Sequence, residues 1–173
     1  MKKIFLIIIV IPFLCFSQQT EDQKKALKIH NDARQDVGSP PLVWSSKLEK
    51  QALLYAKILA RKDEKKRMKH SETNDGENMT YTFSSETINN TTTPTFSQSP
   101  LSDASVGWYE EIKEYNYSKI KRRRIGPPIG HYTQMVWKTT KQVGIAYAIS
   151  KKGSVYVVAR YYPAGNFIGE YPY

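Results

Sequence analysis

The stretch QVGIAYAISKKGSVYVVARYYP, residues 142–163, decides the fold class because it contains two runs of strand character joined by a short polar turn. β-Branched and aromatic side chains are frequent in the runs 142–149 and 154–163, and such side chains pack well on a pleated sheet. The connecting SKKGS is short and turn-like. We therefore predict that the two runs form an antiparallel hairpin.

Three segments with helical periodicity precede this hairpin. The first covers 21–36, where Thr20 and Gln23 fit a capping box and a glycine follows the last apolar position. The second is SSKLEKQALLYAKILARK, residues 45–62, with one of its two leading serines as the N-cap. The third is SDASVGWYEEIKEYNY, residues 102–117, with one of its first two residues as the cap.

Between the second and third helices the apolar periodicity stops. The stretch TFSSETINNTTTPTFSQSP, residues 82–100, is rich in Ser, Thr, Asn and Pro, and we interpret it as a surface loop within one domain. Helices come first and strands follow, with no repeated βα unit. This order predicts an α+β domain whose helices pack on an antiparallel sheet.

The first seventeen residues have the pattern of a secretory signal peptide, with two lysines, an apolar run and a small residue at Ser17, after which we expect cleavage. The apolar run is shorter than the about 20 residues that a transmembrane helix needs. We therefore expect export without a membrane anchor. Cleavage would also remove Cys15, the only cysteine. Residues 18–173 are then predicted to form a single domain without disulfides or thiolate ligands.

The exported protein is predicted to be basic. Loss of the two leader lysines lowers the formal net charge from +10 to +8. Such a charge favours association with anionic surfaces, such as an acidic polysaccharide or lipid headgroups. The basic runs KKRMK and KIKRRR are candidate contacts, although most runs of this kind are simply solvated. Export argues against a nucleic-acid partner, and the oligomeric state stays open.

The three histidines differ in their setting. His30 lies inside the first predicted helix, where a packing or capping role is the plainest interpretation. His70 and His131 stand at junctions between loops and regular elements, where functional side chains concentrate. Carboxylates accompany both of them: Glu77 after His70, and the third helix with Glu110, Glu111 and Glu114. Two imidazoles and two carboxylates could together bind a divalent cation.

Four stretches resemble one known family in their order. They are HNDARQDVGSPPLVWSSKLEKQALLYA, HSETNDGENM, GHYTQMVWKTTKQVGIAYA and YYPAGNFIGEYPY, and they extend over nearly all of residues 18–173. The sequence is similar to the CAP superfamily of SCP-like extracellular proteins. That group includes cysteine-rich secretory proteins, insect venom antigen 5 and plant pathogenesis-related proteins. The resemblance implies a three-layer α-β-α sandwich with an antiparallel sheet.

The resemblance also implies a cleft that brings together two histidines and two glutamates. Carried onto this sequence, the four are His70, Glu77, Glu111 and His131, and Ser71, Tyr132 and Gln134 are candidate supporting residues. The second glutamate follows a tryptophan by three residues in WYEE, which selects Glu111 over Glu110. Helical geometry alone leaves that choice open, because neighbouring residues differ by about 100° around the axis and only one can face the cleft.

Three functions are consistent with such a cleft. The first is a non-catalytic extracellular binding module that holds a divalent cation, with weakly bound zinc expected before magnesium or calcium, and that has a groove for a sterol or another lipid. The second is a metal-assisted, protease-like hydrolase in which Glu77 or Glu111 is the base. The third is a structural or signalling surface. Two neutral histidines are fewer than the three protein ligands usual at catalytic zinc, which favours the binding module.

Overall fold

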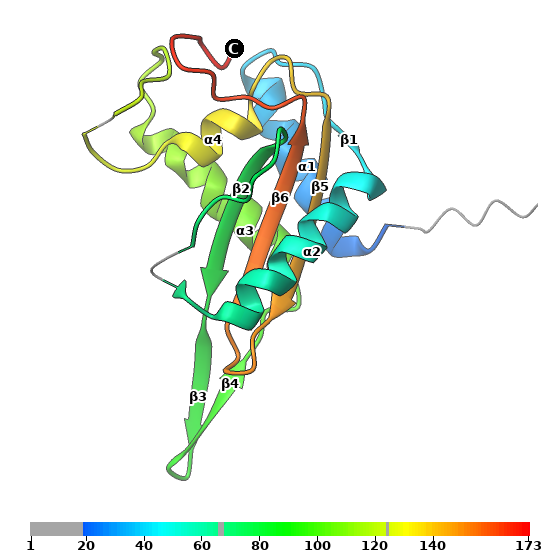
Figure 1. The fold of residues 1–173 in the computed structure, drawn as a ribbon, viewed down its shortest axis with the longest axis vertical. Helices are drawn as coiled ribbons and strands as arrows, with labels where there is room; N and C mark the ends of the chain where they lie inside the picture. Colours follow the sequence, from blue (N-terminus) through cyan, green and yellow to red (C-terminus); the bar gives the residue numbers. More distant parts are fainter. Residues whose placement is uncertain (1–18, 66–67, 124) are drawn as a thin grey trace, which may run out of the picture.

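A four-stranded sheet forms the centre of the computed structural model, which describes residues 19–65, 68–123 and 125–173. Its strand order is β1 (Val43–Trp44), β5 (Gln142–Ile149), β6 (Val155–Tyr162) and β2 (Gly76–Thr82) (Figure 1). β5 and β6 pair in antiparallel register, and β6 pairs with β2 in the same way. The predicted hairpin is therefore confirmed. The predicted signal peptide lies outside the described residues.

One strand departs from the expected antiparallel sheet. β1 runs parallel to β5, with the Val43 N–H bonded to the Lys141 carbonyl at 3.0 Å and the Ser45 N–H to the Val143 carbonyl at 2.8 Å. The two prolines before β1 favour an extended chain, which continues alongside β5. The sheet is mixed for this reason, although the α+β class is confirmed.

Helices cover both faces of the sheet and make the three layers (Figure 1). α2 (Ser46–Lys62) packs on the face formed by Ala146, Tyr156 and Val158. The other face carries α1 (Glu21–Asp36), α3 (Pro100–Tyr109) and the short α4 (Gly130–Met135), which pack against side chains including Val155, Val157, Ala159 and Tyr161. Alternate residues of β6 thus enter opposite cores, as the two-residue period of a strand requires.

Helix starts follow the predicted caps in two of three cases. Thr20 and Gln23 form the capping box of α1, and Ser45, not Ser46, caps α2. α3 begins at Pro100 with Ser99 as N-cap, so Ser102 and Asp103 lie inside its first turn. The sequence could not indicate why α3 begins at Pro100, because the reason lies in another helix.

The acceptor at the start of α3 comes from another helix. Asp22 of α1 accepts from the backbone N–H groups of Leu101 and Ser102, both at 2.9 Å, and from the Ser102 hydroxyl at 2.8 Å. A carboxylate there satisfies backbone donors that have no carbonyl partner within α3. Proline is tolerated in this first turn because its missing N–H would have no helical partner. α3 then continues as a 3₁₀ helix, η2 (Glu110–Glu114).

The predicted surface loop over 82–100 is wrong in its middle, which forms a hairpin of β3 (Ser84–Ile88) and β4 (Thr91–Thr95). The hairpin projects from the body, and every residue of its strands is exposed (Figure 1). Asn89 and Asn90 turn it with φ values of 49° and 61°, a conformation that two-residue hairpin turns require and asparagine tolerates. The strand β2 was not predicted from the sequence either.

Gly144 lets α2 approach the sheet closely, as its place in a strand suggested. A Cβ at Gly144 would stand 2.1 Å from the Glu49 backbone nitrogen and 2.7 Å from the Ser45 carbonyl oxygen. Gly144→Ala should therefore lower the free energy of unfolding by about 1–3 kcal/mol or more, since backbone atoms must move. Gly107→Ala is the matched control, because a Cβ there meets nothing within 4 Å. Urea denaturation measures both, and equal stabilities of the two variants would contradict the close-approach argument.

Candidate functional site

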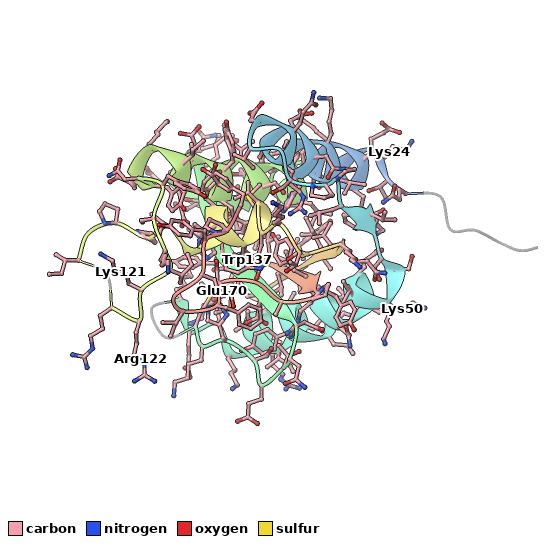
Figure 2. The ribbon with its side chains drawn as sticks, turned by 90° about the horizontal axis from the view of Figure 1, so that it is seen from above. Lys24, Lys50, Lys121, Arg122, Trp137 and Glu170 are labelled. Carbon is pink, nitrogen blue, oxygen red and sulfur yellow. The ribbon has the colours of Figure 1, made fainter. Side chains whose placement is uncertain are left out.

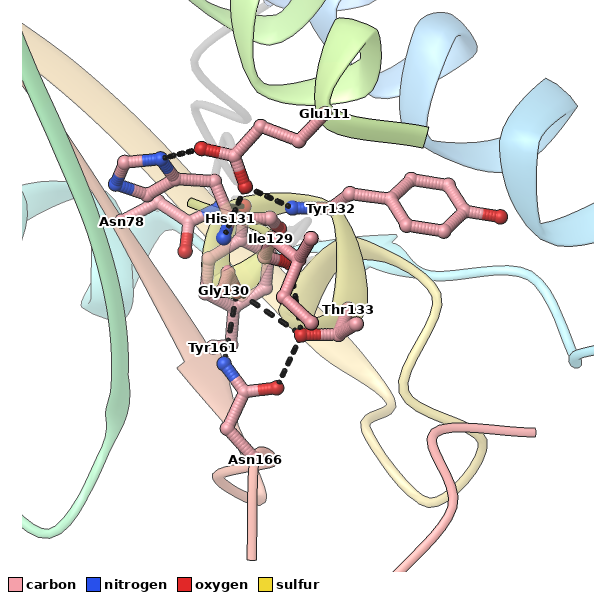
Figure 3. A network of polar contacts seen from close by, with 9 residues as sticks. All are labelled: Asn78, Glu111, Ile129, Gly130, His131, Tyr132, Thr133, Tyr161 and Asn166. Atoms are coloured by element: carbon pink, nitrogen blue, oxygen red, sulfur yellow. Dashed lines mark hydrogen bonds and ion pairs between the residues drawn. The ribbon is translucent and has the colours of Figure 1, made fainter. Parts of the chain in front are cut away.

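Glu111 connects η2 to the start of α4 and orients His131. Its Oε1 accepts from His131 Nδ1 at 2.6 Å, and its Oε2 accepts from the backbone N–H of His131 at 2.8 Å and of Tyr132 at 3.2 Å (Figure 3). A carboxylate is stable there because the first N–H groups of a helix lack helical partners and carry partial positive charge. The same group therefore caps α4 and fixes the imidazole.

The choice between the two neighbouring glutamates is settled by what each contacts. Glu110 forms an ion pair with Lys113 on the exposed side of η2. Glu111 has only 11 % of its side chain exposed and faces His131. The structure therefore agrees with the motif-based choice of Glu111.

Glu77 holds His70 in a similar way from β2. His70 Nδ1 donates to Glu77 Oε1 at 2.7 Å, and Ser71 donates to the same carboxylate through its backbone N–H and its hydroxyl. Arg160 of β6 completes the group, with Nη2 at 3.1 Å from Glu77 Oε2 and 2.6 Å from Ser71 Oγ. Glu77 is 3 % exposed, whereas His70 is 64 % exposed.

The pKa of Glu77 follows from these contacts. Burial alone would raise the pKa of the carboxyl, but hydrogen bonds from His70 and Ser71 and the charge of Arg160 outweigh burial, and the pKa lies below its ordinary value. The carboxylate is thus ionised at neutral pH. It stabilises the fold above its ordinary pKa, and this stabilisation is lost as the pH falls through the lowered value.

Both histidines are left in the same tautomer. A carboxylate only accepts, so each imidazole donates from Nδ1 and carries its lone pair on Nε2 when neutral. Within the described part of the chain, neither Nε2 has a hydrogen-bond partner. Each histidine therefore offers one nitrogen that could bind a cation.

The proposed supporting residues do not all lie at the histidines. Ser71 binds Glu77, as expected. Tyr132 contributes only its backbone N–H, because its ring is buried against Tyr109 and Tyr115. Gln134 is buried and binds the tail instead, accepting from the Gly165 N–H at 2.9 Å. Both of these side chains are buried, and their role in the cleft stays a prediction.

A cavity of about 440 Å³ lies beside His131, between α3 and the strands β2 to β4. Hydroxyl groups form much of one wall, from Thr80, Thr82, Ser84, Thr95 and Ser97. Glu111 and His131 line it, whereas His70 and Glu77 do not. Across residues 19–65, 68–123 and 125–173, no three His, Cys, Asp or Glu side chains gather closely enough to hold a metal ion. The four-residue cation site therefore stays a prediction.

A buried hydrogen-bond chain joins the two halves of the site. Asn78, next to Glu77 in β2, donates through Nδ2 to the His131 carbonyl and to the Tyr161 hydroxyl, both at 3.0 Å (Figure 3). The Tyr161 hydroxyl in turn lies 2.8 Å from Nε2 of His30 in α1. The packing role expected of His30 is therefore a polar one.

The model of the cysteine-rich secretory protein family, the CAP family, matches this chain over residues 27–161. The matched range contains both histidine–glutamate pairs. The chain belongs to this family.

Two CAP relatives are similar over nearly their whole length. Human Golgi-associated plant pathogenesis-related protein 1 is 34 % identical over 158 residues, covering 89 % of this chain and 90 % of that protein. The basic form of pathogenesis-related protein 1 from Nicotiana tabacum is 30 % identical over 175 residues, covering 98 % of this chain and 89 % of that protein. The predicted family is thus confirmed.

Solved structures agree with the CAP fold. The crystal structure titled NaASP2 with Zn2+ has a TM-score of 0.69 at 24 % identity and covers 91 % of this chain and 88 % of that one. The crystal structure of Na-ASP-1 has a TM-score of 0.71 at 23 % identity, covering 91 % of this chain and 42 % of that one. In the described part of this CAP protein, no helix has the length and apolar character to cross a bilayer.

Sequence reasoning missed Arg160 and Asn78, which hold the two glutamate–histidine pairs in place. A signal for Arg160 was present, because a single charged residue interrupts the apolar run VYVVARYY. Arg160 is 5 % exposed, and burying its charge without a partner would cost much free energy. Asn78 gave no comparable signal, since its strand was not recognised.

Because His30 is buried, the stability of the protein should depend on pH in the mildly acidic range. Burial and the nearby Arg34 lower the pKa of His30 from 6.5 to about 4, despite the favourable bond to the Ala26 carbonyl. Between pH 6.5 and 4 His30 is therefore protonated in the unfolded chain but neutral in the folded one. The free energy of unfolding should fall by about 3 kcal/mol as the pH is lowered across this range. Urea unfolding across this pH range tests it. His30→Gln should flatten the slope over that range, and an unchanged slope would refute the assignment.

Proposed function

We propose that this CAP protein is an exported, non-catalytic binding module that holds a divalent cation, preferably zinc, on Nε2 of His70 and His131. One observation carries the proposal: each histidine donates from Nδ1 to a carboxylate and leaves Nε2 with its lone pair available. Metal-binding histidines in proteins commonly have this carboxylate partner, which fixes the tautomer and raises the basicity of the ligand.

In this proposal Glu77 and Glu111 orient the ligands and do not bind the ion. Glu77 already accepts from His70, Ser71 and Arg160, and Glu111 from His131 and Tyr132. Water would complete the coordination shell around two imidazoles. A site with two protein ligands should bind zinc weakly and release it in acid, because protonated imidazole has no lone pair to give.

The hydrolase alternative has less support. A general base needs a carboxylate that is free to take a proton near neutral pH. Glu77 has a lowered pKa and is enclosed by donors, and Glu111 is committed to the start of α4. Both contacts favour an orienting role over a catalytic one.

Export and the choice of zinc have support of different kinds. The leader-like residues 1–17 and membership of a secretory protein family favour export. The structure of similar fold titled NaASP2 with Zn2+ concerns another protein, yet it gives zinc priority as the first cation to test.

Isothermal titration of the purified protein with zinc at neutral pH should give one weak site. Replacing both ligands, with His70→Ala plus His131→Ala, should abolish this binding because no other Nε2 pair would serve. Circular dichroism of the variant confirms that the fold is kept. Undiminished zinc binding by a folded double variant would reject the proposal.

The orienting role of Glu111 has a matched control in its neighbour. Glu111→Gln should weaken zinc binding by about 10- to 100-fold, the usual effect of removing a ligand's carboxylate partner. Glu110→Gln should leave the affinity unchanged, because Glu110 contacts only the exposed Lys113. The same titration measures both, and equal affinities would assign Glu111 a purely structural role.

A further inference from the structure

The loop between η2 and α4 carries a concentrated positive charge that the proposed cation site does not use. We call residues 118–123 and 125–129 the basic loop. Its four described cations, Lys119, Lys121, Arg122 and Arg123, lie within five residues, and the described loop contains no acidic residue. None of the four forms an ion pair within the part of the chain that the structure describes.

The base of the basic loop is fixed by the C-terminal tail. The Ile120 N–H donates to the Glu170 carbonyl and the Gly169 N–H to the Ile120 carbonyl, both at 2.8 Å. Lys119 lies over the Tyr171 ring, with Nζ 5.7 Å from its centre. Glu170 is the one acidic residue of this tail, residues 163–173. The loop is therefore attached at its start while its charged middle extends outward.

Apolar groups accompany the charges. Ile125 is fully exposed, and the loop encloses a cavity of about 660 Å³ lined by Ile120, Pro128, Ile129 and the cations. Figure 2 shows Lys121 and Arg122 at one edge of the molecule, on the side away from Lys24 and Lys50. Apolar side chains exposed singly are normal on protein surfaces, so Ile125 matters here only through its place beside the cations.

The geometry points to the basic loop as a docking surface for a phospholipid bilayer with anionic headgroups. The unpaired cations match phosphate and carboxylate headgroups in charge, and Ile125 would enter the boundary between headgroups and acyl chains. An anionic polysaccharide would engage the cations equally well but would leave Ile125 in water. The combination of charge and apolar tip therefore favours the bilayer, and this role is independent of the cation site.

Charge reversal in the basic loop is the first test. Vesicles of phosphatidylcholine with added phosphatidylserine should sediment the protein, and phosphatidylcholine alone should not. Each basic residue near such a surface contributes about a fivefold gain in partitioning. Lys121→Glu plus Arg122→Glu should therefore lower binding at least about 25-fold. Added salt should weaken the binding of the unaltered protein, because the attraction is screened.

The matched control makes the same charge change elsewhere. Lys47→Glu plus Lys50→Glu alters exposed lysines of α2 and should leave vesicle binding nearly unchanged. Equal losses in the two double variants would show a general charge effect and overturn the assignment to the loop. Equal sedimentation with neutral vesicles would overturn the anionic specificity.

A second variant separates the bilayer from a polysaccharide. Ile125→Ser should reduce vesicle binding about tenfold, since burial of an isoleucine side chain is lost, whereas Leu54→Ser at an exposed position of α2 should not. Retention on dextran sulfate beads provides the comparison. If Ile125→Ser binds vesicles and beads as well as the unaltered protein does, the loop recognises a polyanion through charge alone and the bilayer proposal fails.

Discussion

His30, Tyr161 and Asn78 form a buried hydrogen-bond chain whose direction is determined at its first member. The Ala26 carbonyl can only accept, so His30 donates from Nδ1 and must accept at Nε2. The Tyr161 hydroxyl therefore donates to His30 and accepts from Asn78, whose amide also donates to the His131 carbonyl. The proton on His30 Nδ1 in α1 thus sets the donors and acceptors along a chain that ends at the His131 carbonyl in α4. Each break in the chain would leave a buried polar group unpaired, which is costly.

The short helix α4 exists because charged groups hold both of its ends. Six residues are too few for a helix that is stable alone. Glu111 binds the first N–H groups, and Arg34 binds the carbonyl of the last residue, Met135. The Arg34 guanidinium is buried, has no carboxylate partner among the residues that the structure describes, and donates to the carbonyls of Pro40, Met135, Trp137 and Thr140. Those four carbonyls offset its burial, although burial still lowers its pKa to about 10. The position of His131 is therefore set by distant residues.

Local patterns predicted several elements that local forces determine, and failed where distant residues decide or where one composition suits both a loop and a hairpin. The β5–β6 hairpin, the capping box of α1 and the serine cap of α2 depend on neighbours in sequence, and they were predicted from residues alone. The start of α3 depends on Asp22 of α1, which no local pattern reveals. The β3–β4 hairpin was missed because its Thr- and Asn-rich composition is shared by loops, while the turn conformation at Asn89 and Asn90 gave only a weak signal. The site residues came from family resemblance, and the structure added their partners.

The two histidines are held to different degrees, and this difference bears on any ligand they share. His131 belongs to a helix fixed at both ends and is 30 % exposed. His70 lies in the coil that leads into β2, is 64 % exposed and has its carboxylate partner further bound by Arg160. An ion bound first at His131 would also have to hold the more exposed His70 side chain, and ordering a side chain costs free energy. If the two histidines share the proposed zinc ion, two imidazoles would supply little binding energy beyond that cost, so we expect a reversibly bound ion and not a permanent structural metal.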